Sequence, residues 1–166
     1  MVVVIVALKI KGGVDELLKD VNVLTSQTKG ILSEGVYEGA GLVYKAAKAS
    51  AETIPTDERI YVREGTKKHG ITSGQKASLI ESLGIAPFES DNGEVQTKIG
   101  VDGYNSVVTR AWPKGQPNII IARALINGTS WLRAYDFIGR ARRQIKNEAE
   151  RAMEDVVRRK IKDKTK

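Results

Sequence analysis

The chain has 166 residues, contains no cysteine and carries a single histidine, His69. These counts exclude disulfide frameworks, zinc ribbons, iron–sulfur clusters and multi-histidine metal sites. The 27 Lys and Arg exceed the 20 Asp and Glu, and the resulting net charge of +7 favours an anionic partner. Aromatic residues make up only 5% of the chain, which argues against a base-stacking platform for single-stranded nucleic acid. The length predicts one domain over residues 1–166.

The first third of the chain predicts a strand followed by two helices. Residues 1–8 are rich in β-branched side chains and too few to span a membrane, so we expect a core strand there. Apolar residues then recur at helical spacing over 14–24, and the polar residues 25–28 are expected to end that short helix. A longer helix is expected from about 30 to 54, closed by Pro55.

The side chains along the predicted inner face of this long helix, which we call its inner stripe, are unusually small. Gly35 and Gly39 lie four residues apart, and Ala46 follows on the same stripe. A glycine in a helix interior costs about 1 kcal/mol, so we expect the close approach of another backbone to offset that cost. The backbone that approaches the stripe is expected to belong either to the protein's own sheet, which is preferred, or to a neighbouring subunit.

The middle of the chain predicts short elements separated by polar loops. Residues 59–63 alternate in the manner of a strand, and residues 64–70 form a polar loop flanked by glycines. Ser73 is the expected N-cap of a short helix that ends at Gly84.

The remainder of the chain predicts two strands and two helices. The strands are expected at 85–88 and 94–101, around a turn. The apolar run 119–126 is interpreted as a helix capped by Asn118, and a long helix is expected from about 135 to 161. Helices before and after a central group of strands indicate an α+β fold, with a small antiparallel sheet packed by the two long helices.

The last helix and the tail that follows it, about 135–166, concentrate the basic charge. Residues 133–166 contain twelve Lys and Arg against six Asp and Glu, so six of the seven net charges lie there. This surface is interpreted as an electrostatic contact with nucleic acid or an acidic protein, above all at its terminal lysines. For the helix body a solvated face is preferred, because Glu154–Arg158 and Asp155–Arg159 are favourable i,i+4 pairs. The candidate residues are Arg140, Arg143, Arg151, Arg158, Arg159, Lys160, Lys162 and Lys164.

Residues that resemble catalytic groups are poorly placed for chemistry. Thr129 and Ser130 supply hydroxyls, but there is no second histidine to act together with His69. Asp57 and Glu58 are adjacent, and adjacent carboxylates on an extended segment point to opposite sides. We therefore predict that the chain is not an enzyme and that it uses neither a cofactor nor a metal.

Several short motifs occur in an order that is similar to one known family. They are IKGGVDELL at 10–18, ETIP at 52–55, TSGQKASLIESL at 72–83, KIGV at 98–101, INGTS at 126–130 and the Asp136-Phe137 step. This order resembles the tail-component and neck-protein family of long-tailed bacteriophages, commonly called gene-product-ten-like. Three positions depart from the family pattern: Asn127 stands at the end of the apolar run in place of an acidic residue, Asp136 replaces a proline, and Ser73 is an extra residue.

The resemblance implies a structural virion protein at the phage neck or upper tail, made in the host cytoplasm. It would join head to tail or complete the tail as a ring around the DNA passage, with sixfold symmetry and no membrane contact. Its neighbours would be head-closure or connector proteins and tail-terminator or tail-tube proteins, and contact with packaged double-stranded DNA stays open. In that ring the stripe of Gly35, Gly39 and Ala46 is expected to pack helix against sheet. The alternative function is a basic accessory protein that binds double-stranded nucleic acid.

Overall fold

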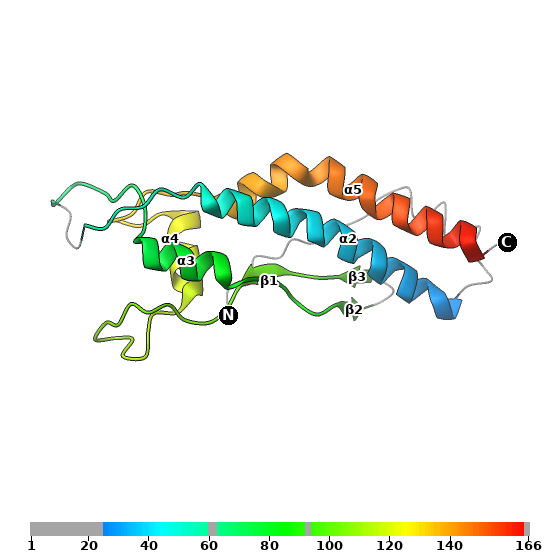
Figure 1. Cartoon of the computed structure of the whole chain (residues 1–166), viewed down its shortest axis with the longest axis horizontal. Helices are drawn as coiled ribbons and strands as arrows, with labels where there is room; N and C mark the ends of the chain where they lie inside the picture. Colours follow the sequence, from blue (N-terminus) through cyan, green and yellow to red (C-terminus); the bar gives the residue numbers. More distant parts are fainter. Residues whose placement is uncertain (1–24, 60–62, 92–93, 165–166) are drawn as a thin grey trace.

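The computed structural model describes residues 25–59, 63–91 and 94–164 (Figure 1). The predicted N-terminal strand and first short helix lie outside these residues, as does most of the segment 59–63. The described part has an α+β fold, as predicted, built from helices and two antiparallel strand pairs. Its helices are α2 (Thr25–Glu52), α3 (Ser73–Glu81), α4 (Asn118–Asn127) and α5 (Phe137–Lys164). Its strands are β1 (Leu83–Ile85), β2 (Glu89–Asp91), β3 (Glu94–Gln96) and β4 (Ile99–Val101).

Helix α2 is the central layer of the molecule. The long helix α5 runs beside it on one side, and β1, β3 and β4 contact it on the other (Figure 1). Helices α3 and α4 pack against each other at the end of the molecule where α2 finishes. The two long helices therefore form a rod, and the smaller elements are gathered along one side and at one end of it.

Helix α2 begins earlier than the sequence predicted. It includes residues 25–28, so the expected polar break there is wrong. Those residues lack apolar periodicity, but none of them is a proline, and polar side chains alone do not end a helix. At the other end the Ile54 amide donates to the Ala51 carbonyl over 3.1 Å, and Pro55 follows, as predicted.

Helix α3 is capped by Thr72 and not by Ser73. The Gln75 amide donates to the Thr72 hydroxyl over 3.2 Å, and the Thr72 amide donates to the Gln75 side-chain oxygen over 3.1 Å. This reciprocal pair is a capping box, which satisfies two backbone donors at once and therefore outcompetes a lone serine. The helix ends at Ser82, so Gly84 lies in β1 and does not end the helix.

The four strands form one bent hairpin. Ile85 pairs with Ile99 in β1–β4, whereas Glu89 pairs with Gln96 in β2–β3. Three residues, 86–88, therefore face two residues, 97–98, across the break, which is the arrangement of a β-bulge. Pro87 lies in the longer segment, where a residue without an amide hydrogen is tolerated.

Helix α4 confirms the helical interpretation of the run 119–126 but corrects the role of Asn118. Pro117 is the N-cap, and Asn118 is the first helical residue, buried at 2% exposure. Its side-chain amide donates to the Asp102 and Ser78 carbonyls over 3.1 and 3.4 Å, so it ties α4 to α3. Gly128 ends the helix with a φ of +71°, in the left-handed region that favours glycine.

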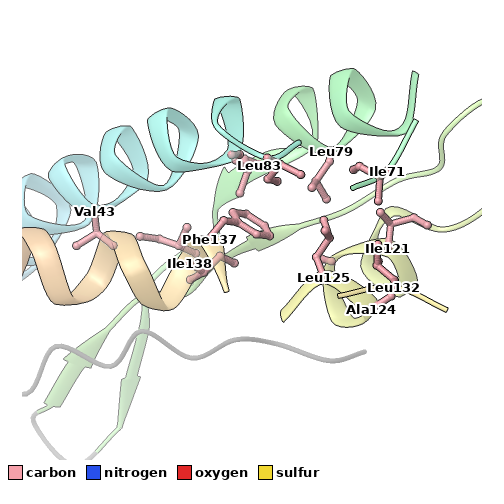
Figure 2. Close-up of a cluster of buried hydrophobic side chains, with 14 of the residues drawn as sticks. Val43, Ile71, Leu79, Leu83, Ile121, Ala124, Leu125, Leu132, Phe137 and Ile138 are labelled. Atoms are coloured by element: carbon pink, nitrogen blue, oxygen red, sulfur yellow. The ribbon is translucent and has the colours of Figure 1, made fainter. Parts of the chain in front are cut away.

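One apolar cluster joins the described helices. Figure 2 shows it running from Val43 and Ile138, between the long helices, through Phe137 to Leu79 and Leu125 of the short ones. Each of these five side chains is at most 2% exposed. Because α5 begins inside this cluster, its first turn packs between the apolar residues of the long helices and those of the short helices.

Candidate assembly surfaces

The two glycines of α2 lie in the contact with α5. A Cβ atom at Gly39 would lie 2.5 Å from Cγ of Met153 and 3.3 Å from the Ala149 carbonyl oxygen. A Cβ atom at Gly35 would lie 2.9 Å from a methyl group of Val157. These separations are shorter than ordinary van der Waals contacts, so a larger side chain would have to displace Met153 or Val157 or push the helices apart.

The close partner of the small stripe is therefore α5 of the same chain. Close helix packing is thus confirmed for Gly35 and Gly39, but the expectation that these two glycines pack against the sheet or a neighbouring subunit is wrong. Ala46 is only half-buried, and the adjacent Ala47 is fully buried in its place. The sequence showed that the stripe needed a close neighbour but not which one, since two amphipathic helices and a sheet all offered an apolar face.

The first turn of α5 holds two of the predicted basic residues in local contacts. The Asp136 carboxylate accepts from the Gly139 amide over 2.8 Å and lies 3.6 Å from the Arg143 guanidinium. Arg140 lies over the ring of Tyr135, 4.3 Å from its centre. This part of the predicted surface thus serves the start of the helix, where a carboxylate is favoured by the helix dipole.

The outer face of α5 is different. Arg151, Arg158 and Arg159 are exposed, and in the described part of the chain none of the three forms an ion pair. The pairs expected with Glu154 and Asp155 do not form among these residues, so the arginines are not neutralised within their own helix.

The final turns of α5 complete this surface. Lys160 donates to Glu34 of α2 over 2.6 Å, which fastens the ends of the two long helices. Lys162 is exposed, and Lys164 is the last residue of the helix, with a side chain outside the described part. The structure therefore divides the predicted basic surface into a tethered start, three exposed arginines further along the helix, and a lysine that bridges to α2.

The carboxylates that sequence analysis considered for catalysis stabilise a loop instead. The hydrogen bonds from the Arg59 guanidinium and from the backbone of Arg59 and His69 hold the pKa of Asp57 below its usual range. The amide and hydroxyl of Ser73 lower the pKa of Glu58, and that amide donates over 2.6 Å. The two carboxylates thus have separate partners, as their adjacency predicted.

The other candidate groups also lie in structural backbone contacts. The Thr129 hydroxyl accepts from the Leu132 amide over 2.9 Å, in the turn before α5. His69 is exposed and its amide donates to Asp57 over 3.3 Å, while the preceding Lys68 bridges to Leu132 in the turn that follows Thr129. Among the residues that the structure describes, no three His, Cys, Asp or Glu gather as metal ligands would. No helix in that same part is long and apolar enough to cross a membrane.

Residues 103–117 form a projecting loop, which we call the finger, and this projection was not predicted from the sequence. Its base is closed by the Asn105 amide, which donates to the Gln116 carbonyl over 2.9 Å, and by a bridge between Tyr104 and Pro117. At its tip the backbones of Thr109 and Trp112 bond to each other in both directions, over 3.2 and 3.0 Å. The signal in the sequence was a pair of valines and a tryptophan between turn residues, a region without the period of a helix or strand.

Sequence analysis also missed a hollow between the long helices, which we call the α2–α5 hollow. It has a volume of about 340 Å³. Tyr37 and Phe88 meet edge to face at its rim, with ring centres 5.8 Å apart. The lining residues are Ser33, Glu34, Tyr37, Glu38, Phe88, Val156 and Arg159.

Comparison of the chain with protein-family models, with curated proteins and with solved structures finds no match in any of the three.

Proposed function

We propose that the chain is a structural virion protein of the neck or upper tail of a long-tailed phage. It joins head to tail, or completes the tail, as a ring of sixfold symmetry around the DNA passage. It is made in the host cytoplasm and ends in the virion, next to connector or head-closure proteins and tail-terminator or tail-tube proteins. In this role the chain catalyses no reaction and needs no cofactor.

The observation that carries the proposal is where the shared motifs lie in the fold. Four of the six mark a junction between elements, while KIGV lies in β4 and IKGGVDELL lies outside the described residues. Pro55 follows α2, Thr72 caps α3, and Gly128 ends α4. Phe137, the last of them, is completely buried where α5 begins. Residues at such junctions determine the order and direction of the helices, so their shared order supports a shared architecture.

The departure at Asp136 is compatible with that argument. Proline is favoured at the start of a helix because its φ is already helical and it has no amide to satisfy. Aspartate serves the same start by another route, since its carboxylate accepts from the Gly139 amide. The function of this position, beginning the last helix, is therefore kept although the residue differs.

The test is to disrupt the gene in the phage that encodes it and to examine the lysate by electron microscopy. The proposal expects filled heads and separate tails, with infectivity restored when the wild-type chain is supplied from a plasmid. Complete, infectious virions that form without the protein would overturn the proposal.

The second candidate, a double-stranded nucleic-acid-binding protein, is favoured by one observation. Arg151, Arg158 and Arg159 are exposed without ion pairs in the described part of the chain. If residues 158–166 neutralise DNA phosphates, their removal weakens DNA binding and makes the dependence of log K on log salt shallower, by about 0.9 for each phosphate that is no longer neutralised. Unchanged affinity and an unchanged salt slope would reject this candidate.

A further inference from the structure

Two of the surfaces that expose large apolar side chains lie toward opposite ends of the molecule. In the finger, Val108 is 66% exposed and Trp112 is 37% exposed. In the α2–α5 hollow, Tyr37 is 57% exposed and Phe88 is 39% exposed. The finger projects from the end where α3 and α4 lie, while the hollow lies toward the start of α2 and the end of α5 (Figure 1). Exposed apolar groups gathered in this way mark interaction sites.

The finger is held in its projecting shape before anything binds it. Gly115 has a φ of +105° and packs directly against the Asn105 carbonyl, where a side chain would not fit. Asn105 is itself buried, and its side-chain oxygen accepts from the Val107 amide over 2.8 Å. A loop ordered by its own contacts loses little conformational entropy on binding, so its exposed side chains contribute more fully to affinity.

The two surfaces also differ in charge. The finger carries Arg110 and Lys114, both exposed, and within the described residues neither forms an ion pair. The hollow carries Glu34, which faces Lys160, and Glu38, which is exposed and has no ion pair in the same part of the chain. Arg159 also lines the hollow, and Lys160 already neutralises Glu34, so Glu38 on α2 is the carboxylate that remains for a cation.

We propose that the finger of one copy docks in the α2–α5 hollow of the next copy, with Trp112 against Tyr37 and Phe88. This inference rests on the proposed ring and identifies the contact that builds it. The two partners use different surfaces, so the contact is heterologous, and a heterologous contact gives a closed ring when its rotation closes.

A second copy fits both surfaces better than an unrelated partner does. Each surface supplies what the other lacks: a projection for a hollow, and cations for Glu38, the carboxylate of the hollow that has no ion pair among the described residues. A hollow of about 340 Å³ is of the size that holds one large aromatic side chain with its neighbours. Closure of the ring then covers both surfaces in every copy and leaves neither exposed.

The test uses two variants that each remove one half of the contact. Trp112→Ser disables the finger, and the double change Tyr37→Ser with Phe88→Ser disables the hollow. We expect light scattering after size exclusion to show multi-copy assemblies for the wild type. Each variant should stay monomeric at protein concentrations at least about tenfold above the one at which the wild type assembles. An equimolar mixture of the two variants keeps one intact contact per pair, so it should give dimers of one copy of each and nothing larger.

Trp131→Ser is the matched control, because Trp131 is 43% exposed on a different loop. It should assemble as the wild type does, and circular dichroism melts should show that all variants are folded. Wild-type assembly by Trp112→Ser, equal loss of assembly in Trp131→Ser, or a mixture that stays monomeric would each overturn the contact.

These outcomes separate the contact from the proposed function. If Trp112→Ser assembles normally and complete virions still require the gene, the ring is built by another surface and the proposed function stands. If the wild type stays monomeric and virions form without the gene, both proposals fail.

Discussion

The two faces of α5 differ in how closely they are packed and in how much charge they expose. Its inner face presents Ala149, Met153 and Val157 to the glycines of α2, at separations that leave no room for an added carbon. Its outer face presents arginines such as Arg151 and Arg158, exposed and without ion pairs in the described part of the chain. The inner face fixes the fold and tolerates no enlargement, whereas the outer face contributes little to the fold and is available to a partner.

The largest effect is expected on the inner face. Gly39→Leu places new carbons against Met153, and overpacking of this kind should lower the free energy of unfolding by about 3 kcal/mol. Urea denaturation followed by circular dichroism measures the change. The matched control is Gly41→Leu, where a Cβ atom meets nothing within 4 Å. That variant should be unchanged or more stable by up to about 1 kcal/mol, because leucine is the better helix former. Equal effects at both positions would contradict the close contact between α2 and α5.

A smaller loss is expected where α5 begins. Asp136→Ala removes the carboxylate that accepts from Gly139 and faces Arg143, and loss of a helix cap costs about 1 kcal/mol. Asp155→Ala is the control, because Asp155 is an exposed acid further along the same helix with no ion pair among the described residues. A thermal melt in which the two variants lose equal stability would show that Asp136 is not a cap.

Among the substitutions in the helices, those on the outer face of α5 should change the free energy of unfolding least. Arg151→Ala and Arg158→Ala are each expected to change the free energy of unfolding by less than about 0.5 kcal/mol. Lys160→Ala should cost somewhat more, up to about 1 kcal/mol, since it breaks the bridge to Glu34. Urea denaturation measures all three variants. A loss above about 2 kcal/mol for either arginine would show that the outer face is part of the fold, which contradicts the comparison.

The mildest effect is local and depends on pH. The pKa of Asp57 and that of Glu58 are both lowered in the folded chain, so their contribution is present above the unfolded pKa values, near 4, and is lost as the pH falls below them. Hydrogen exchange at the His69 and Ser73 amides should therefore show reduced protection below about pH 4, relative to core amides such as that of Val43. Asp57→Asn should remove this dependence at His69. Protection at His69 that does not change with pH in the wild type would contradict the assignment.

The long helices could be predicted because apolar residues recur at helical spacing over many turns of each. The apolar face of α5, including Ile138, Ala149 and Met153, follows helical spacing along the helix, and the structure buries all three. Their mutual contact was not predictable, since periodicity shows that a face is covered and not by what. Short signals failed for a related reason: Ser73 has a good capping side chain, but Thr72 and Gln75 together form two bonds where Ser73 offers one.

The exposed surfaces were the hardest to predict. Trp112 and Val108 are apolar residues in a region without period, and nothing in the sequence distinguishes a projecting loop from a buried one. The hollow depends on Tyr37 of α2, Phe88 beside β2 and Val156 of α5, which only the fold brings together. Ion pairs are likewise set by side-chain geometry, which is why Arg158 and Glu154 do not pair in the described structure although their spacing allows it.

The central claim is that copies of this chain form a ring at the head–tail joint, and imaging that joint tests it most directly. Cryo-electron microscopy of intact virions should show, between head and tail, a closed ring whose density fits the α2–α5 rod in every copy. A resolved neck and upper tail that contain no copy of this chain would contradict the account.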